Sequence, residues 1–138
     1  MADAPPAADV VAVAEFRAAL RRFMRVSERN ARGAGLTPQR YLLLLMIKGA
    51  PDQSEQSTVT ELAERLQLAQ STVTELVSRA EEIGLVERER SSEDGRIGIL
   101  RLTPEGERRL AQVFTSNERE RQALSRAFEH LQATGLPT

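Results

Sequence analysis

Hydrophobic positions between residues 58 and 102 change their spacing along the chain, and the change predicts two helices followed by a hairpin. In the first helix Leu62, Ala63 and Leu66 recur at helical spacing, and Thr60 is the expected N-cap. Leu68-Ala69-Gln70 leaves room only for a corner. A second helix follows, with Ser71 as its expected N-cap. Its apolar residues share one face at the 3.6-residue period: Val73, Leu76, Val77, Ala80 and Ile83.

The opposite face of this second helix is small and polar. It carries Ser71, Thr74, Glu75 and Ser78, flanked by Arg79. A helix of this kind, held up by a perpendicular partner, fits the major groove of DNA, which is about as wide as one helix. An ordinary solvated helix has the same pattern, so the helix pair alone leaves both interpretations open.

The pattern then becomes that of a β-hairpin. Gly84 fits a left-handed C-cap, and Leu85 to Arg88 alternates as a strand does. Asp94-Gly95 is a strong hairpin-turn signal, and Ile97 to Leu102 supplies the returning strand. Helix, turn, helix and hairpin in this order predict a winged helix-turn-helix. Its hairpin carries Arg88, Arg90, Arg96 and Arg101.

Helical patterns also occupy both ends of the chain. Residues 9–31 predict a helix with Asp9 as N-cap, and residues 104–134 predict another that opens with Thr103-Pro104. Residues 115–122 of the last helix are wholly polar. This segment either runs clear of the body and re-engages a partner subunit, or bends. The apolar stripe of the first helix is typical of a core, but a helix with no preceding element must pack on the rest of the chain or on a second copy.

The middle of the chain predicts a buried helix and a polar connection. Thr37-Pro38 supplies an N-cap and a first-turn proline, and residues 41–47 are apolar all round. This helix is therefore expected at the centre of the domain. Residues 49–57 form a polar connection with turn character.

Composition limits the class of protein. A chain of 138 residues fits one domain, and no apolar run approaches the roughly 20 residues that cross a bilayer. Residues 1–8 lack the features of a signal peptide and are expected to be a disordered tail, which favours a cytoplasmic protein. There is no cysteine, and the single histidine, His130, has only Glu129 beside it. The sequence therefore predicts no metal site, no cofactor and no catalytic triad.

Several motifs in consistent order resemble one family. They are Glu61-Leu62-Ala63, Gln70-Ser71-Thr72-Val73-Thr74, Ile83-Gly84-Leu85-Val86, Asp94-Gly95-Arg96 and Leu100-Arg101-Leu102-Thr103-Pro104-Glu105-Gly106. Together they resemble the MarR (multiple antibiotic resistance regulator) family. The resemblance implies a mainly α fold with a small β-hairpin, in which residues 37–103 form a winged-helix lobe and residues 9–32 and 104–134 form dimerisation helices. It implies a homodimeric regulator of transcription on near-palindromic DNA, often released by a small aromatic or anionic compound lodged between the first, second and last helices.

The expected contacts fall into two groups. Hydroxyl groups of the second helix would bond phosphates or base edges, Arg79 would reach a phosphate, and Arg96 would enter a minor groove, oriented by Asp94 as the family motif implies. The predicted DNA-binding residues are Gln70, Ser71, Thr72, Thr74, Glu75, Ser78, Arg79, Arg88, Arg90, Asp94 and Arg96. The predicted dimerisation residues are Val10, Val13, Phe16, Leu20, Leu124, Phe128 and Leu131.

Charge supports a second hypothesis. The net charge of −1 is awkward for a DNA-binding protein, although 18 of the 19 basic residues are arginines and those between 79 and 101 concentrate on the second helix and the hairpin. Glu75 stands in the middle of the groove face, where relatives often carry a basic or neutral residue. It favours the alternative, a winged-helix module that binds protein and no longer binds DNA.

Overall fold

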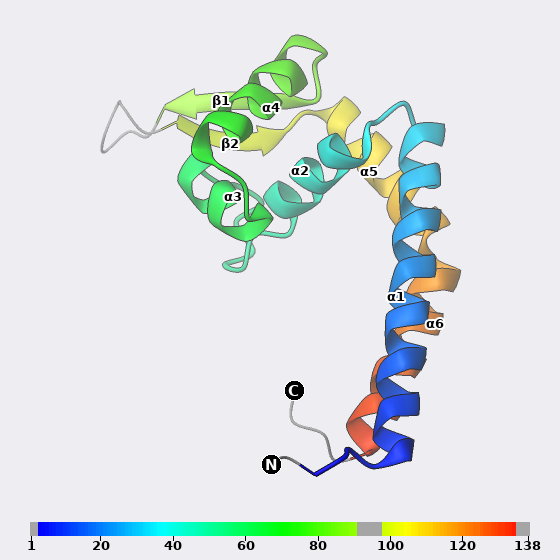
Figure 1. The fold of residues 1–138 in the computed structure, drawn as a ribbon. Coiled ribbons are helices and arrows are strands. Elements are labelled where there is room, and N and C mark those ends of the chain that lie inside the picture. The colour runs from blue at the N-terminus through cyan, green and yellow to red at the C-terminus, as the bar shows by residue number, and fades with distance from the viewer. Residues whose placement is uncertain (1–2, 91–97, 135–138) are drawn as a thin grey trace. The chain divides into compact units, whose positions relative to one another are not determined.

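A computed structural model describes residues 3–90 and 98–134 of the chain. Over these residues it contains six helices and one pair of strands (Figure 1). In chain order they are α1 (Ala7–Gly33), α2 (Pro38–Lys48), α3 (Val59–Leu66), α4 (Gln70–Glu82), β1 (Val86–Arg90), β2 (Gly98–Leu102), α5 (Pro104–Ser116) and α6 (Glu118–Ala133). The chain divides into two compact units: the described parts of Met1–Asn30 and Phe114–Thr138 form one, and Ala31–Val113 forms the other.

The second unit is a winged helix, as the sequence predicted. β1 pairs with β2 in antiparallel register, from Val86 opposite Leu102 to Arg90 opposite Gly98. In the polar connection before α3, Ser57 forms an isolated antiparallel bridge with Leu100 of β2. The N–H of Ser57 donates to the carbonyl of Leu100 at 3.0 Å, and the N–H of Leu100 donates back at 2.8 Å. This exchange fixes the end of the connection against the hairpin.

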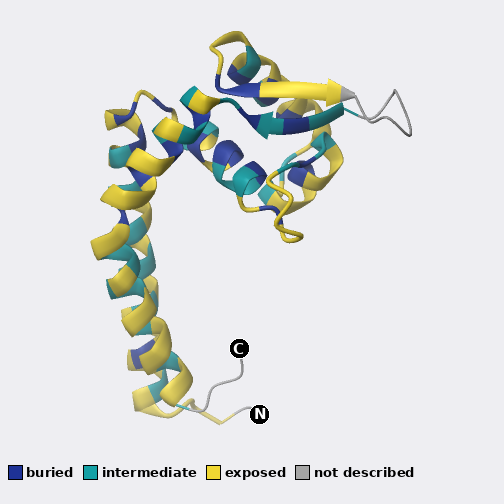
Figure 2. Ribbon diagram, turned by 180° about the vertical axis from the view of Figure 1, so that it is seen from behind, coloured by how far each residue is buried: buried dark blue, intermediate teal, exposed yellow. Residues whose placement is uncertain are grey.

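Buried residues of α2, α3, α4 and the hairpin form the core of this unit (Figure 2). On α2 they are Tyr41, Leu43, Leu44 and Ile47. The helix is therefore central, as expected. It is not buried on every side, because Leu42 keeps 42% of its surface exposed.

Three predicted N-caps are wrong. The cap of α3 is Thr58 rather than Thr60, because Thr58 completes a reciprocal capping box with Glu61. Helix α4 begins at Gln70 after Ala69, so Ser71 lies inside its first turn. Helix α1 begins at Ala7 rather than at Asp9, whose N–H already donates to the carbonyl of Pro6 at 3.1 Å.

In the first unit α1 lies along α6 (Figure 1). The rings of Phe16 and Phe128 are 6.0 Å apart between centroids. The segment expected to be one last helix is two, interrupted at the buried Asn117. The amide of Asn117 donates to Ser27 Oγ at 3.0 Å and accepts from Asn30 Nδ2 at 2.8 Å. These bonds hold a polar side chain inside the helix pair.

Gly106 provides a test of the packing in the second unit. An added Cβ would lie 2.2 Å from the Leu85 carbonyl oxygen, a backbone atom that cannot move without shifting β1. We expect Gly106→Ala to lower the free energy of unfolding by about 1–3 kcal/mol, the usual effect of overpacking. Urea unfolding monitored by circular dichroism measures the change. Gly33→Ala is the control, because its Cβ would meet nothing within 4 Å. Equal stabilities of the two variants would contradict the close contact.

Candidate nucleic-acid interface

One face of α4 is buried and the other is open. Val73, Val77 and Ala80 are buried against the lobe. The predicted helix residues are all exposed: Gln70, Ser71, Thr72, Thr74, Glu75, Ser78 and Arg79. At 100° per residue, Ser71, Glu75 and Ser78 point away from the buried side. The structure thus gathers these seven side chains on the accessible part of a single helix.

Glu75 and Arg79 form an ion pair on this helix. Arg79 Nη2 lies 3.4 Å from Glu75 Oε1, one helical turn away, and the two side chains are 62% and 69% exposed. A solvated pair of this kind contributes at most about 1 kcal/mol. The two charges therefore offset each other in the free protein and remain free to rearrange.

A groove separates the exposed side of α4 from the start of α2. Its volume is about 540 Å³. One wall is the N-cap Thr37 with Pro38, Gln39 and Arg40 of α2, and the other is Thr72, Glu75, Leu76 and Arg79 of α4. Arg40 was missed by the sequence-based prediction. Its Nε is buried and makes no hydrogen bond within the described part of the chain. The Thr37-Pro38 helix start placed Arg40 in a first turn, but only the fold brings that turn to α4.

Two of the hairpin arginines, Arg88 and Arg101, have acidic partners. Arg88 Nη2 donates to Glu81 Oε1 of α4 at 2.9 Å. Its side chain passes over Gly98, where an added Cβ would lie 3.1 Å from Arg88 Cδ. Arg88 therefore ties β1 to the end of α4.

Arg101 lies opposite two glutamates of β1. Its Nε is 3.2 Å from Glu87 Oε1, and its Nη2 contacts Glu89. The cation is therefore neutralised within the hairpin. The predicted hairpin-tip residues Asp94 and Arg96 lie outside the described residues, as does the side chain of Arg90.

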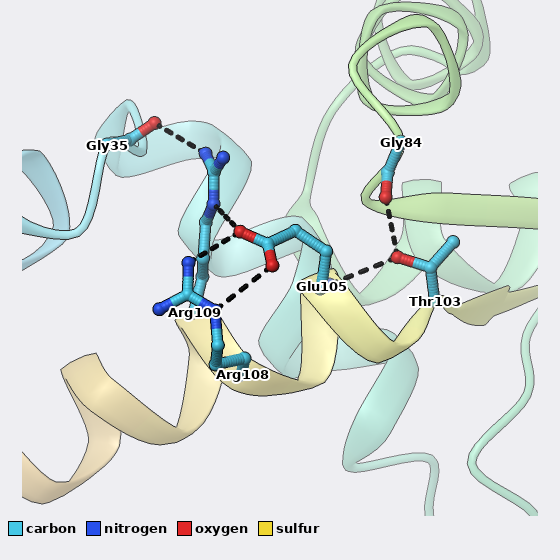
Figure 3. A network of polar contacts seen from close by, with 7 residues as sticks. Gly35, Gly84, Thr103, Glu105, Arg108 and Arg109 are labelled. Atoms are coloured by element: carbon cyan, nitrogen blue, oxygen red, sulfur yellow. Dashed lines mark hydrogen bonds and ion pairs between the residues drawn. The ribbon is translucent and has the colours of Figure 1, made fainter.

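Polar contacts join the C-terminal end of α4 to the start of α5 (Figure 3). Thr103 Oγ1 donates to the carbonyl of Gly84 at 2.6 Å and accepts from the N–H of Gly106 at 3.1 Å. Gly84 has the left-handed φ of 76° expected for it. These bonds hold the turn that leads from the helix into the hairpin.

Glu105 is bonded to two arginines of α5, and one of them also reaches the segment after α1. It accepts from Arg108 Nη2 at 2.6 Å and from Arg109 Nε at 2.8 Å, and Arg109 also donates to the carbonyl of Gly35 at 3.4 Å (Figure 3). The hydrogen bonds from Arg108 and then Arg109 lower the pKa of Glu105 to about 2. The segment after α1 is thereby connected to α5.

Other chemistry has little support in the described residues. Among them no three His, Cys, Asp or Glu side chains gather as metal ligands. His130 Nε2 lies 4.0 Å from Glu15 Oε2, and both side chains are exposed. None of the helices in the described ranges has the length and apolar character to cross a membrane.

Comparisons with known proteins agree with the resemblance found in the sequence. Residues 34–97 match the model of the MarR family. YusO from Bacillus subtilis is 26% identical with a TM-score of 0.62, over 86% of this chain and 84% of that protein. MarR from E. coli in its apo form is 19% identical with a TM-score of 0.71, over 99% and 100%. A mutant E. coli MarR complexed with operator DNA is 21% identical with a TM-score of 0.67, over 88% and 90%. A comparison with curated protein sequences finds no match.

The match to the MarR family model, together with the winged helix, indicates a DNA-binding transcriptional regulator, a class without catalytic activity. Residues 34–97 match the MarR family model, and the fold is similar to that of E. coli MarR, which agrees with the resemblance of the sequence motifs.

The lowered pKa of Glu105 predicts a specific pH dependence of stability. Its pKa is lower in the folded chain than the ordinary value of 4.5, so its contribution is present above pH 4.5 and is lost as the pH falls toward about 2. Glu105→Gln should make the loss of stability across this range shallower. Urea unfolding at several pH values measures the slope. Glu64→Gln, an exposed α3 variant for which the described chain shows no ion pair, should keep the wild-type slope, and equal slopes in both variants would refute the assignment.

Proposed function

We propose that this regulator is a homodimeric repressor that acts in the cytoplasm on a near-palindromic operator and is released by a small aromatic or anionic compound. The observation that carries the proposal is the accessible polar face of α4 beside a groove with two arginines, Arg40 and Arg79. The operator complex of an E. coli relative with the same fold supports it. The division into a DNA-binding lobe, residues 37–103, and dimerisation helices, 9–32 and 104–134, is part of this proposal.

In this proposal α4 enters the major groove by its N-terminal half. Ser71, Thr72 and Thr74 hydrogen-bond to base edges or phosphates, as a helix in the groove allows. Arg40 and Arg79 lie on the two walls of the protein groove between α2 and α4. Each neutralises a phosphate of the DNA strand that borders the major groove. Arg96 reaches the adjacent minor groove from the hairpin.

A gel-shift titration against DNA upstream of the protein's own gene tests the proposal. Repeating it at about 50 and 200 mM salt measures the electrostatic part, because each neutralised phosphate makes affinity fall more steeply with salt. Specific, salt-sensitive binding is expected. The absence of DNA binding even at low salt would favour the protein-interaction module instead, for which the acidic Glu75 and the paired Arg88 are the supporting features.

Arg40→Ala tests the phosphate contact beside α4. The variant should weaken binding to all DNA sequences and reduce the salt slope by about one. Fluorescence anisotropy with labelled operator and scrambled DNA measures both effects. Arg108→Ala is the matched control, since it removes the same charge from a guanidinium already bound to Glu105. An unchanged slope for Arg40→Ala would remove Arg40 from the interface.

Exposed apolar residues at the chain ends support the dimer. Val10, Val13 and Phe128 are 50%, 44% and 39% exposed, and an apolar depression of about 380 Å³ lies beside Val10 and Val13. The other predicted dimerisation residues, Phe16, Leu20, Leu124 and Leu131, are half-buried within the first unit. Large exposed apolar patches on a protein often mark an interface.

The dimer makes a direct prediction about mass. Light scattering at micromolar concentration should give twice the chain mass of 15.3 kDa. The double variant Val10→Asp and Val13→Asp should give the single mass, because two carboxylates would be buried without partners. Ala18→Asp, on another face of α1, should remain dimeric. A wild-type monomer would rule out the dimer and, with it, recognition of a palindrome.

A further inference from the structure

Glu75 lies at the position of α4 where a negative charge would lower the affinity for DNA most. It is on the side of α4 opposite the buried Val73 and Val77, and its side chain is 69% exposed. A carboxylate pushed into the major groove is repelled by the phosphates on both sides. Burial without a hydrogen-bond donor would add a desolvation penalty. A hydrogen-bond donor on the base edges would offset both costs.

The base edges of the major groove offer few such donors. An ionised carboxylate only accepts hydrogen bonds, and only the amino groups of cytosine and adenine donate there. Adenine also presents the acceptor N7 beside its amino group, which opposes a second carboxylate oxygen. Cytosine is therefore the base that fits Glu75 best.

Arg79 makes a carboxylate at this place tolerable. It stands four residues after Glu75 and pairs with it at the long distance of 3.4 Å. Four residues advance about 6 Å along a helix, which lies between one and two base-pair steps of about 3.4 Å. Arg79 can thus keep the Glu75 charge offset while it contacts a phosphate or a guanine of a neighbouring base pair.

We propose that Glu75 is a specificity-determining residue that accepts a hydrogen bond from a cytosine amino group in each operator half-site. The proposal rests on the function proposed above and adds the base that the helix selects. The acidic side chain then contributes sequence discrimination at the expense of non-specific affinity. Low non-specific affinity for DNA also agrees with the net charge of −1 of the chain.

Selection from a randomised DNA library tests the assignment. Wild type should retain cytosine at one fixed position in each half-site. Glu75→Gln should shift that position to adenine, because glutamine bonds both N6 and N7 of adenine. Glu75→Ala should lose the preference there and bind non-specific DNA more tightly. Operators that differ only at this position should differ in affinity by about 5- to 150-fold, in opposite order for wild type and Glu75→Gln.

Glu82→Gln is the matched control. Glu82 is also an exposed glutamate of α4, but it lies at the C-terminal end of the helix, away from the N-terminal half proposed to contact bases. Its variant should keep the wild-type base preference. Specific DNA binding with the same preference in wild type and Glu75→Gln would overturn the role of Glu75 and leave the proposed function intact. The absence of sequence-specific binding by wild type would overturn the proposed function itself.

Discussion

The winged-helix lobe depends on a backbone contact between Leu85 and Gly106. The carbonyl of Leu85 accepts from the N–H of Thr103 at 3.0 Å and occupies the space that a Cβ of residue 106 would need. The N–H of Leu85 meanwhile donates to Ala80 of α4 at 2.9 Å. One residue therefore joins the end of α4, the start of β1 and the start of α5. Because these are backbone contacts, the hairpin starts at a fixed place relative to the helix proposed to read DNA.

Charge on the lobe is mostly balanced in pairs. Arg88 bonds Glu81, and Arg101 lies against Glu87 and Glu89, so the hairpin stem offers less free positive charge than its sequence suggests. Arg40 lies beside the exposed face of α4, and Arg79 on that face is paired with Glu75 only at 3.4 Å. Affinity would then rest on a small number of phosphate contacts, and discrimination on base contacts made by the helix. This division reconciles DNA binding with a net charge of −1.

Local sequence signals predicted the order of elements, because each signal acts within a few residues. Thr37-Pro38 starts α2 as expected, and Gly84 takes the left-handed conformation that ends α4. The wrong cap of α3 was also a local matter, since Glu61 selects Thr58 rather than Thr60 through its carboxylate. The spacing of Thr58 and Glu61 is itself the local capping-box signal.

Contacts between distant residues could not be predicted in the same way. The bridge from Ser57 to Leu100 and the bonds of Asn117 to Ser27 and Asn30 join positions at least 43 residues apart. The position of Arg40 beside α4 could not be predicted from local signals either. Polarity alone marked residues 115–122 as unusual, and it left open whether the helix continued or bent. The interruption falls at Asn117, whose buried amide is bonded to Ser27 and Asn30 of α1.

Methylation interference on the bound operator tests most directly whether α4 occupies the major groove. Dimethyl sulfate places a methyl group on guanine N7, which faces that groove, so methylation should block binding of a helix seated there. Two clusters of interfering guanines should appear, with centres one helical turn of about 34 Å apart or a multiple of it, as a two-fold dimer requires. Tight, specific binding that N7 methylation leaves unaffected throughout the operator would contradict the seating of α4 in the groove.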